Sequence, residues 1–218
     1  MIDVNSGEEK LHINLDITLY KSPCDILSLD IVDVTGVHVV DIEGKLVKHR
    51  LNEAGEEIGI IQHIDDDGHT DSDAAVKGMD AEYRNSVAAM AKTQTIYENT
   101  VKGLKNNEGC KMSGFVWINK VPGNFHISGH HYPDAVQKLY MAGYKLDFSH
   151  KINHLSFGNL KDIEHIKKTY NEKINFELDG RDIPQEKYAQ SMGMGNFGGP
   201  SSLNVNYFLE ISQVDYVD

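Results

Sequence analysis

The stretch near the start of the chain that decides its fold is Leu11-His12-Ile13-Asn14-Leu15-Asp16-Ile17-Thr18-Leu19. Apolar and polar side chains alternate through it without interruption. Successive side chains of a β-strand point to opposite faces of the sheet. This period of two therefore predicts a strand with one face in the core and one polar face.

Similar short runs continue on both sides of the middle of the chain, and glycine and proline separate them. Such punctuation is typical of antiparallel strands joined by turns, so we expect the first four runs to form a meander. The runs after the first are Asp25–Val34, Val37–Ile42, Lys45–Leu51, Lys111–Lys120, Phe125–Ser128 and Leu203–Val214.

A helical pattern interrupts the strands between Ser72 and Lys105. The segment is rich in alanine, contains no proline, and carries apolar side chains at spacings of three and four. We predict an amphipathic helix, or a pair of helices, lying on the sheet. A helix that binds a partner is the alternative. The apolar positions are Val76, Met79, Tyr83, Val87 and Met90, followed by Tyr97, Val101 and Leu104.

The 218 residues suit one large domain or two small ones, and they are enough for a substantial core. We predict a single, mainly β domain over residues 1–218. Its β-rich parts are residues 8–60 and 109–214, and its helical insertion covers about residues 72–105. Shorter helices are predicted at Pro133–Tyr140 and Ile163–Tyr170.

The charge of the chain bears on its partners. Thirty-three acidic residues against 21 basic ones give a formal net charge of -12. A field of this sign repels phosphate backbones, so we expect no nucleic-acid partner. Apolar stretches such as Val87–Ala91 are far shorter than the roughly 20 residues of a membrane-spanning helix.

Eleven histidines raise the question of a metal site. His126, His130 and His131 are close in sequence, and His150 and His154 are four residues apart. None of them lies in an H-E-x-x-H motif, so ordinary hydrogen-bonding roles are favoured over zinc. The acidic segment 65–69 lacks EF-hand spacing, which favours a surface loop over a calcium site. We expect no metal and no cofactor.

The sequence also lacks the usual catalytic motifs. It contains no G-x-S-x-G elbow and no G-x-G-x-x-G phosphate loop. The two cysteines, Cys24 and Cys110, are not in a Cys-x-x-Cys pair, and composition leaves open whether they form a disulfide or stay free. Trp117 is expected in the core. These absences favour a protein-binding domain that is not an enzyme.

Four segments together resemble a known family. Two motifs are specific as a pair: Asn-Lys-Val-Pro-Gly-Asn-Phe-His at 119–126 and His-Leu-Ser-Phe-Gly at 154–158. The chain resembles the luminal domain of the endoplasmic reticulum vesicle transporter family, the cargo receptors of the ER–Golgi intermediate compartment. The four segments are Glu9–Thr18, Pro23–Asp30, Glu108–Ile127 and Phe148–Gly158.

The resemblance implies a twisted antiparallel β-sandwich with a helical insertion, facing the lumen of the ER, the intermediate compartment and the Golgi. It implies membrane helices flanking the domain and cytoplasmic tails that contact coat proteins, both absent from this chain. It also implies cargo proteins as ligands and a paralogous subunit in a hetero-oligomer. The function expected is retrieval or sorting of proteins in coated vesicles. The alternative is a disulfide-isomerase-associated or redox domain of the ER lumen.

The resemblance also assigns roles to particular residues. Because the ER lumen is oxidising, it implies a Cys24–Cys110 disulfide. It makes His126, His150 and His154 candidates for a response to pH, since histidines change charge between about pH 5 and 8. Turn positions are expected at Gly114, Gly123 and Asn124, and core positions at Phe125, Leu155 and Phe157. One branch of the family has extra central cysteines, which this chain lacks, and this argues against a redox role.

Overall fold

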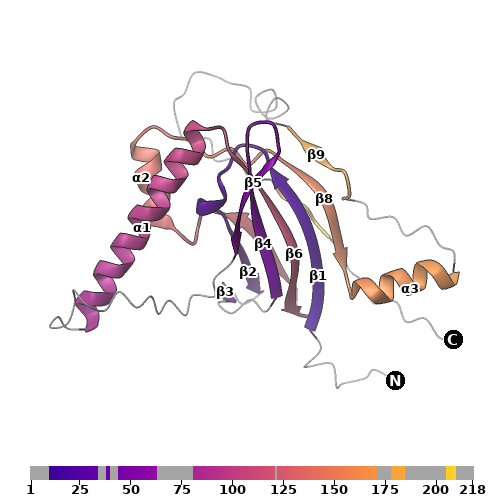
Figure 1. The fold of residues 1–218 in the computed structure, drawn as a ribbon. Coiled ribbons are helices and arrows are strands. Elements are labelled where there is room, and N and C mark those ends of the chain that lie inside the picture. The colour runs from indigo at the N-terminus through magenta and orange to yellow at the C-terminus, as the bar shows by residue number, and fades with distance from the viewer. Residues whose placement is uncertain are drawn as a thin grey trace.

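The computed structural model describes residues 10–33, 38–39, 44–62, 81–120, 122–170, 178–184 and 205–209. Two antiparallel sheets, with helices at the margins, make up these parts of the chain (Figure 1). The acidic segment 65–69 lies outside the described residues, as does the first part of the predicted helix.

The larger sheet has six strands, and the alternating stretch Leu11–Leu19 lies inside it. Strand β1 pairs along its whole length with β6, from Lys10 opposite Asn119 to Leu19 opposite Cys110. Its other edge pairs with β8, with an irregularity between Asp16 and Ile17. In spatial order the strands are β5 (Glu57–Gln62), β4 (Gly44–Leu51), β6 (Gly109–Asn119), β1 (Lys10–Leu19), β8 (His150–Phe157) and β9 (Asp182–Ile183).

The smaller sheet has the order β3 (His38–Val39), β2 (Ser28–Asp33) and β7 (Gly123–Ser128). The predicted meander is therefore wrong, because β1 does not pair with β2. After β1, the short 3-10 helix η2 (Cys24–Ile26) leads the chain from one sheet to the other. Most partners of a strand here are distant in sequence, so local turn signals could not identify them.

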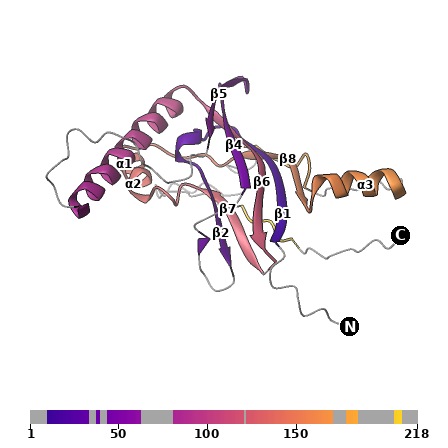
Figure 2. The same ribbon diagram turned by 60° about the horizontal axis from the view of Figure 1, so that its bottom comes forward.

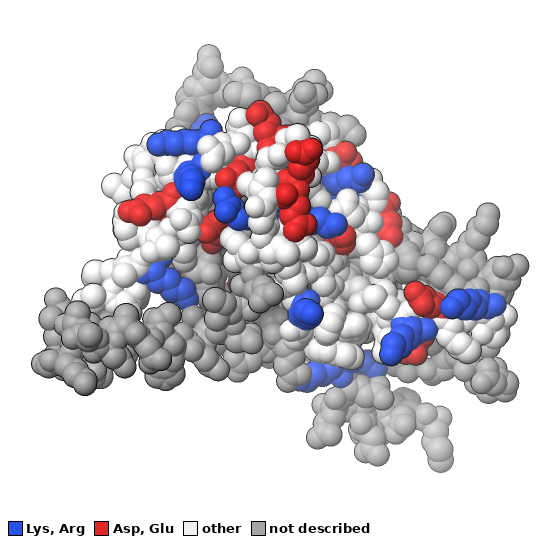
Figure 3. Space-filling view, in the orientation of Figure 1, with Lys and Arg blue, Asp and Glu red and all other residues white. Residues whose placement is uncertain are grey.

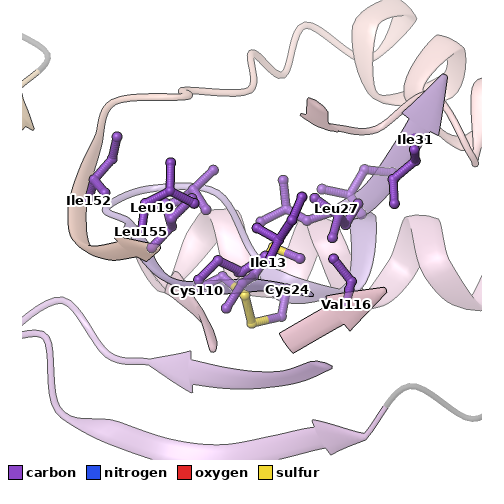
Figure 4. Close-up of a cluster of buried hydrophobic side chains, with 14 of the residues drawn as sticks. Ile13, Leu19, Cys24, Leu27, Ile31, Cys110, Val116, Ile152 and Leu155 are labelled. Carbon is purple, nitrogen blue, oxygen red and sulfur yellow. A yellow bond between two sulfur atoms is a disulfide. The ribbon is translucent and has the colours of Figure 1, made fainter. Parts of the chain in front are cut away.

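One cluster of buried side chains draws on both sheets (Figure 4). The alternating residues Ile13, Leu15, Ile17 and Leu19 of β1 are all buried in it, as the period of two predicted. The antiparallel, mainly β fold is confirmed, whereas its description as a sandwich stays a prediction. Other strands contribute Leu29, Ile31, Met112, Val116, Ile152 and Leu155, with Phe125 and Phe157 packed against the cluster.

Helix α1 (Ala81–Lys105) is half docked and half exposed. Its later residues Ile96, Tyr97, Val101 and Leu104 pack against the core, whereas Val87 and Met90 are exposed. The expectation that the apolar stripe lies on the sheet is therefore wrong at Val87 and Met90, while Val76 and Met79 lie outside the described residues. Helix α2 (Pro133–Met141) contacts α1, and α3 (Leu160–Tyr170) lies on the opposite side of the molecule in both ribbon views (Figures 1 and 2).

Three expected turn positions prove to be strand residues. Gly123 and Asn124 are the first two residues of β7. Gly114 lies in the middle of β6 with φ +141°, between Leu15 of β1 and Leu46 of β4. A Cβ atom at Gly114 would collide with the carbonyl oxygen of Lys45. The glycine therefore permits a close approach of two strands. Residues 205–209, within the predicted closing strand, are not in a strand.

Candidate functional site

The three histidines proposed to respond to pH lie in different parts of the two sheets. His126 is on β7 of the smaller sheet, whereas His150 begins β8 and His154 lies halfway along it in the larger sheet. The structure does not gather them into one site. Each has its own set of partners, and these decide what a change of charge would do.

His126 stands directly opposite Asp30 in the pairing of β7 with β2. Its Nε2 atom is 3.5 Å from Oδ2 of Asp30. The same carboxylate oxygen accepts hydrogen bonds from Ser28 Oγ at 3.0 Å and Ser128 Oγ at 3.1 Å. The ring of His130 lies edge-on to that of His126, with centroids 5.5 Å apart. Protonation here would place positive charge beside a shielded carboxylate and next to a second imidazole.

One ring nitrogen of His154 contacts a carboxylate, and the other contacts a hydroxyl. Nδ1 is 2.8 Å from Oδ2 of Asp179, and Nε2 is 2.9 Å from Oγ of Ser156. The other carboxylate oxygen of Asp179 accepts a hydrogen bond from the backbone N–H of Leu155 at 2.9 Å. Asp179 thus ties the turn before β9 to β8. A protonated His154 would strengthen that tie.

The order Asp179–His154–Ser156 is that of a hydrolase triad, so the accessibility of the serine matters. Ser156 is only 2% exposed, and its hydroxyl also accepts a hydrogen bond from Nδ2 of Asn14 at 3.1 Å. A nucleophile must reach a substrate carbonyl carbon. This hydroxyl is enclosed by β1 and β8, so the arrangement serves structure rather than acyl transfer.

His150 is held by two neutral groups. Nδ1 lies 2.8 Å from the carbonyl oxygen of Phe148, so this nitrogen carries the proton and donates. Nε2 lies 2.9 Å from the hydroxyl of Tyr207, which donates to it when the ring is neutral. His150 therefore fastens segment 205–209 to the start of β8. Protonation would force the Tyr207 hydroxyl to reverse its role and become the acceptor.

The polar face of the large sheet carries an interaction network that the sequence analysis did not identify. Asp16 forms an ion pair with Lys111 at 3.0 Å and accepts a hydrogen bond from Nδ2 of Asn153 at 2.8 Å. Further along the same sheet, His49 lies 2.9 Å from a carboxylate oxygen of Glu57 and 3.2 Å from Oγ of Ser113. The alternation of polar residues in β1 was the signal that could have predicted part of this network. Its partners on β4, β6 and β8 follow only from strand register.

A buried lysine is the other feature that sequence reasoning missed. Lys48 of β4 points into the core, where its Nζ donates to the carbonyl oxygen of Leu27 at 2.5 Å. Burial lowers the pKa of Lys48 to about 8, although the carboxylates of Asp25 and Asp30 oppose the shift. Lys48 links the larger sheet to the segment between η2 and β2.

Cys24 and Cys110 form a disulfide, and both are buried in the core. The bond joins η2 to the first residues of β6 across 86 positions of the sequence. In the chain-entropy model, closing such a loop restricts the unfolded chain by about 4–5 kcal/mol. The disulfide implied by the family resemblance is confirmed, and its burial keeps it from exchange with other thiols.

The described parts of the chain hold neither a metal-binding cluster nor a membrane-spanning helix. No group of three or more histidine, cysteine or acidic side chains there is arranged to hold a metal ion. No helix in those parts is both long and apolar enough to cross a membrane. Trp117, expected in the core, is instead partly exposed on the polar face, with its ring 4.4 Å from that of His12. The histidines and carboxylates of the two sheets can form hydrogen bonds and ion pairs, and the histidines can take up protons.

The strands and the disulfide described above are built largely from the segments that suggested a family. The family model described as endoplasmic reticulum vesicle transporter matches residues 80–217. The chain belongs to this family. A second model, for the endoplasmic reticulum–Golgi intermediate compartment (ERGIC) family, matches residues 1–40. The family predicted from the sequence motifs is thus confirmed.

Two curated relatives match most of this chain and about half of their own length. It is 32% identical over 217 residues to probable endoplasmic reticulum-Golgi intermediate compartment protein 3 of Dictyostelium discoideum, covering 82% of this chain and 56% of that protein. It is 29% identical over 230 residues to ER-derived vesicles protein ERV46 of Saccharomyces cerevisiae, covering 80% of this chain and 54% of that protein. The chain therefore spans about half the length of these relatives.

A crystal structure of Erv41p is a distant structural neighbour. The match covers 82% of this chain and 66% of the Erv41p chain, at 18% identity and a TM-score of 0.42. Family and relatives together place the chain among ER–Golgi transport proteins.

Proposed function

We propose that this chain is the luminal domain of a membrane cargo receptor that cycles between ER and Golgi and retrieves or sorts proteins in coated vesicles. The observation that carries the luminal assignment is the buried Cys24–Cys110 disulfide. Disulfides form and persist in oxidising compartments and are rare in the cytosol. A domain of an ER–Golgi transport family with a disulfide in its core fits the luminal side of the membrane.

The role of a binding module is favoured over that of an enzyme. Two described serines are hydrogen-bonded in the order of a triad: Ser156, which is 2% exposed and enclosed between two strands, and Ser113, which lies in the middle of β6 beside His49 and Glu57. The redox alternative is disfavoured as well, because the one disulfide is buried and the chain has no further cysteine to exchange with it. Binding needs no catalytic group, and half-buried polar side chains such as His154, Asp16 and His49 lie on the polar face of the large sheet.

The family supports a proposal for the partners as well. In the full-length protein we expect flanking membrane helices to hold this domain in the ER, intermediate compartment and Golgi membranes. Cytoplasmic tails would contact the coat. A paralogous subunit would assemble with the receptor, and cargo proteins would be its ligands. No nucleic acid is expected, given the net charge of -12.

A topology and capture experiment tests this proposal. The full-length protein would be placed in sealed microsomes, digested with protease and then purified with its associated proteins. We expect this domain to be protected until detergent is added, and a paralogous subunit and secretory-pathway proteins to co-purify. Digestion without detergent would contradict the luminal assignment. Co-purification of the paralogous subunit without any cargo would contradict the receptor role.

We also propose that acidification changes cargo binding through His126, His150 and His154. His126 and His154 lie beside carboxylates, so their protonation adds local ion pairing. His150 would act through the hydroxyl of Tyr207. Each change alters the surface around β7 or β8. The compartments through which such a receptor cycles differ in acidity within the range in which histidines titrate.

The matched comparison is between His154→Gln and His131→Gln. His131 is exposed and lies against Tyr132, so its replacement controls for the loss of a surface imidazole. We expect cargo capture by the wild type to differ between about pH 7 and 6, the range in which histidines change charge. His154→Gln should reduce that difference, and His131→Gln should preserve it. Equal capture by the wild type at the two pH values would show that these histidines do not regulate binding.

A further inference from the structure

Strand β5 forms one edge of the six-stranded sheet. Among the described residues it pairs with β4 and with no other strand. Its outward side chains include two exposed isoleucines, Ile58 at 49% and Ile60 at 55%. Natural edge strands are commonly protected by lysine, by proline, by a β-bulge or by a covering element. The sequence of β5, Glu-Ile-Gly-Ile-Ile-Gln, contains neither lysine nor proline, and its pairing with β4 is regular from Gly59 to Gln62 with one irregularity at Ile58.

The order of residues in β5 makes it complementary to itself. In an antiparallel pairing of two copies centred on Gly59, Ile58 of each copy would face Ile60 of the other. Glu57 would face Ile61 of the second copy, so no two like charges would stand directly opposite each other. Apolar β-branched pairs stabilise neighbouring strands, whereas opposed like charges destabilise them. Shifting the centre by one residue would lose these matched pairs.

We propose that β5 is an interface at which two copies of this chain associate. The two β5 strands would pair antiparallel across a two-fold axis and join their large sheets into one. A two-fold interface requires a patch that is complementary to itself, and β5 is one. In the region where Figure 1 draws β5 and its hairpin with β4, Figure 3 shows white and red side chains with blue ones beside them. The acidic side chains Glu53 and Glu56 of that hairpin lie outside the matched isoleucines.

Charge sets the conditions under which the pairing should be strongest. Each copy carries a net charge of -12, so two copies repel each other at low salt. At about 0.15 M ionic strength the Debye length is about 8 Å, which screens most of this repulsion. The apolar pairs and the strand hydrogen bonds depend much less on salt. Self-association through β5 should therefore increase with salt, unlike an interface held by ion pairs.

Analytical ultracentrifugation of the 218-residue chain tests the interface. We expect a monomer–dimer equilibrium that shifts towards dimer with salt. Ile60→Lys should shift it to monomer, because a lysine on an edge strand opposes pairing. Met90→Lys, on the exposed half of α1, is the matched control and should leave the equilibrium unchanged. A wild type that stays monomeric at every concentration, or an Ile60→Lys dimer as strong as the wild type, would overturn the proposal.

Crosslinking tests the register independently of affinity. Gly59→Cys would place the two new thiols opposite each other at the two-fold axis, where paired strands bring Cα atoms to about 4.5–5.5 Å. We expect a covalent dimer under mild oxidation. Ala54→Cys, at the exposed tip of the β4–β5 hairpin, should give little, because position 54 does not meet its counterpart. Equal crosslinking of both variants, or of neither, would rule out this pairing.

Discussion

Arg50 and Glu108 form an ion pair with three hydrogen-bond contacts beside the disulfide. The Nε atom of Arg50 donates to Oε2 of Glu108 at 3.1 Å, and Nη2 donates to Oε1 and Oε2 at 2.9 and 2.8 Å. Arg50 pairs with Cys110 in the sheet, so the ion pair and the disulfide reinforce the same junction of β4 and β6. The side chain of Glu108 is 4% exposed and that of Arg50 is 33% exposed.

This difference in burial predicts an unequal cost of breaking the pair. Arg50→Gln leaves a buried carboxylate without its cation, which costs about 3 kcal/mol or more of unfolding free energy. Glu108→Gln leaves a guanidinium that still reaches water, so we expect a loss of about 1–2 kcal/mol. Urea denaturation of the non-reduced proteins measures both. A larger loss for Glu108→Gln than for Arg50→Gln would contradict this account.

Lys48 predicts a dependence of stability on alkaline pH. The unfolded chain keeps the proton of this lysine up to about its ordinary pKa of 10.5, whereas the folded chain releases it near pH 8. Between these values the unfolded chain binds more protons, so stability rises with pH. From pH 8 to 10 the gain is about 2–3 kcal/mol.

Denaturation curves at pH 7, 9 and 10 would show this gain in the wild type and its loss in Lys48→Met. Lys45→Met, an exposed position on the same strand, is the control that should keep the wild-type slope. The comparison ends at pH 10, because burial and Asp182 raise the pKa of Tyr20 to about 12. Above pH 10 the unfolded chain loses that proton first, so stability then falls. Parallel slopes for the wild type and Lys48→Met would refute the role of Lys48.

Alanine substitutions at Gly114 and Gly143 distinguish the cost of a steric collision from the cost of backbone strain. Both glycines have positive φ, at +141° and +83°. A Cβ atom at Gly114 meets the backbone of Lys45, whereas one at Gly143 meets nothing within 4 Å. We expect Gly114→Ala to lower the unfolding free energy by about 3 kcal/mol or more and Gly143→Ala by about 1 kcal/mol. Similar losses in thermal denaturation would mean that the close approach of β4 to β6 is not limiting.

The burial of Ser156 predicts that the Asp179–His154–Ser156 arrangement is not catalytic. A fluorophosphonate probe that labels activated serines should leave the folded chain unmodified, while a serine hydrolase in the same tube is labelled. Ser156→Ala should instead lower stability by about 1–2 kcal/mol, because Asn14 and His154 lose a buried partner. Ser86→Ala, on the exposed part of α1, should cost little. Labelling lost specifically in Ser156→Ala would establish a nucleophile.

Local pattern predicted the elements well where one face of an element is buried. The alternation of β1 predicted four buried side chains, and the strand and helix residues of β6, α2 and α3 were close to those predicted. It failed at Val87 and Met90 of α1, because their spacing is the same whether or not a surface is present to cover them. It also missed Lys48, because a lysine between Val47 and His49 gives no sign that its stem points inwards.

The chain's own sequence determined the mainly β class, the central strand, the family and the two cysteines of the disulfide. These follow from side-chain periodicity and from contiguous motifs, which are properties of neighbouring residues. Only the tertiary structure decided that β1 lies between β6 and β8, that His154 reaches Asp179, and that β5 is left at an edge. Those relationships depend on residues that are far apart along the chain. They depend on which pairings bury the most apolar surface together, and no local pattern records that sum.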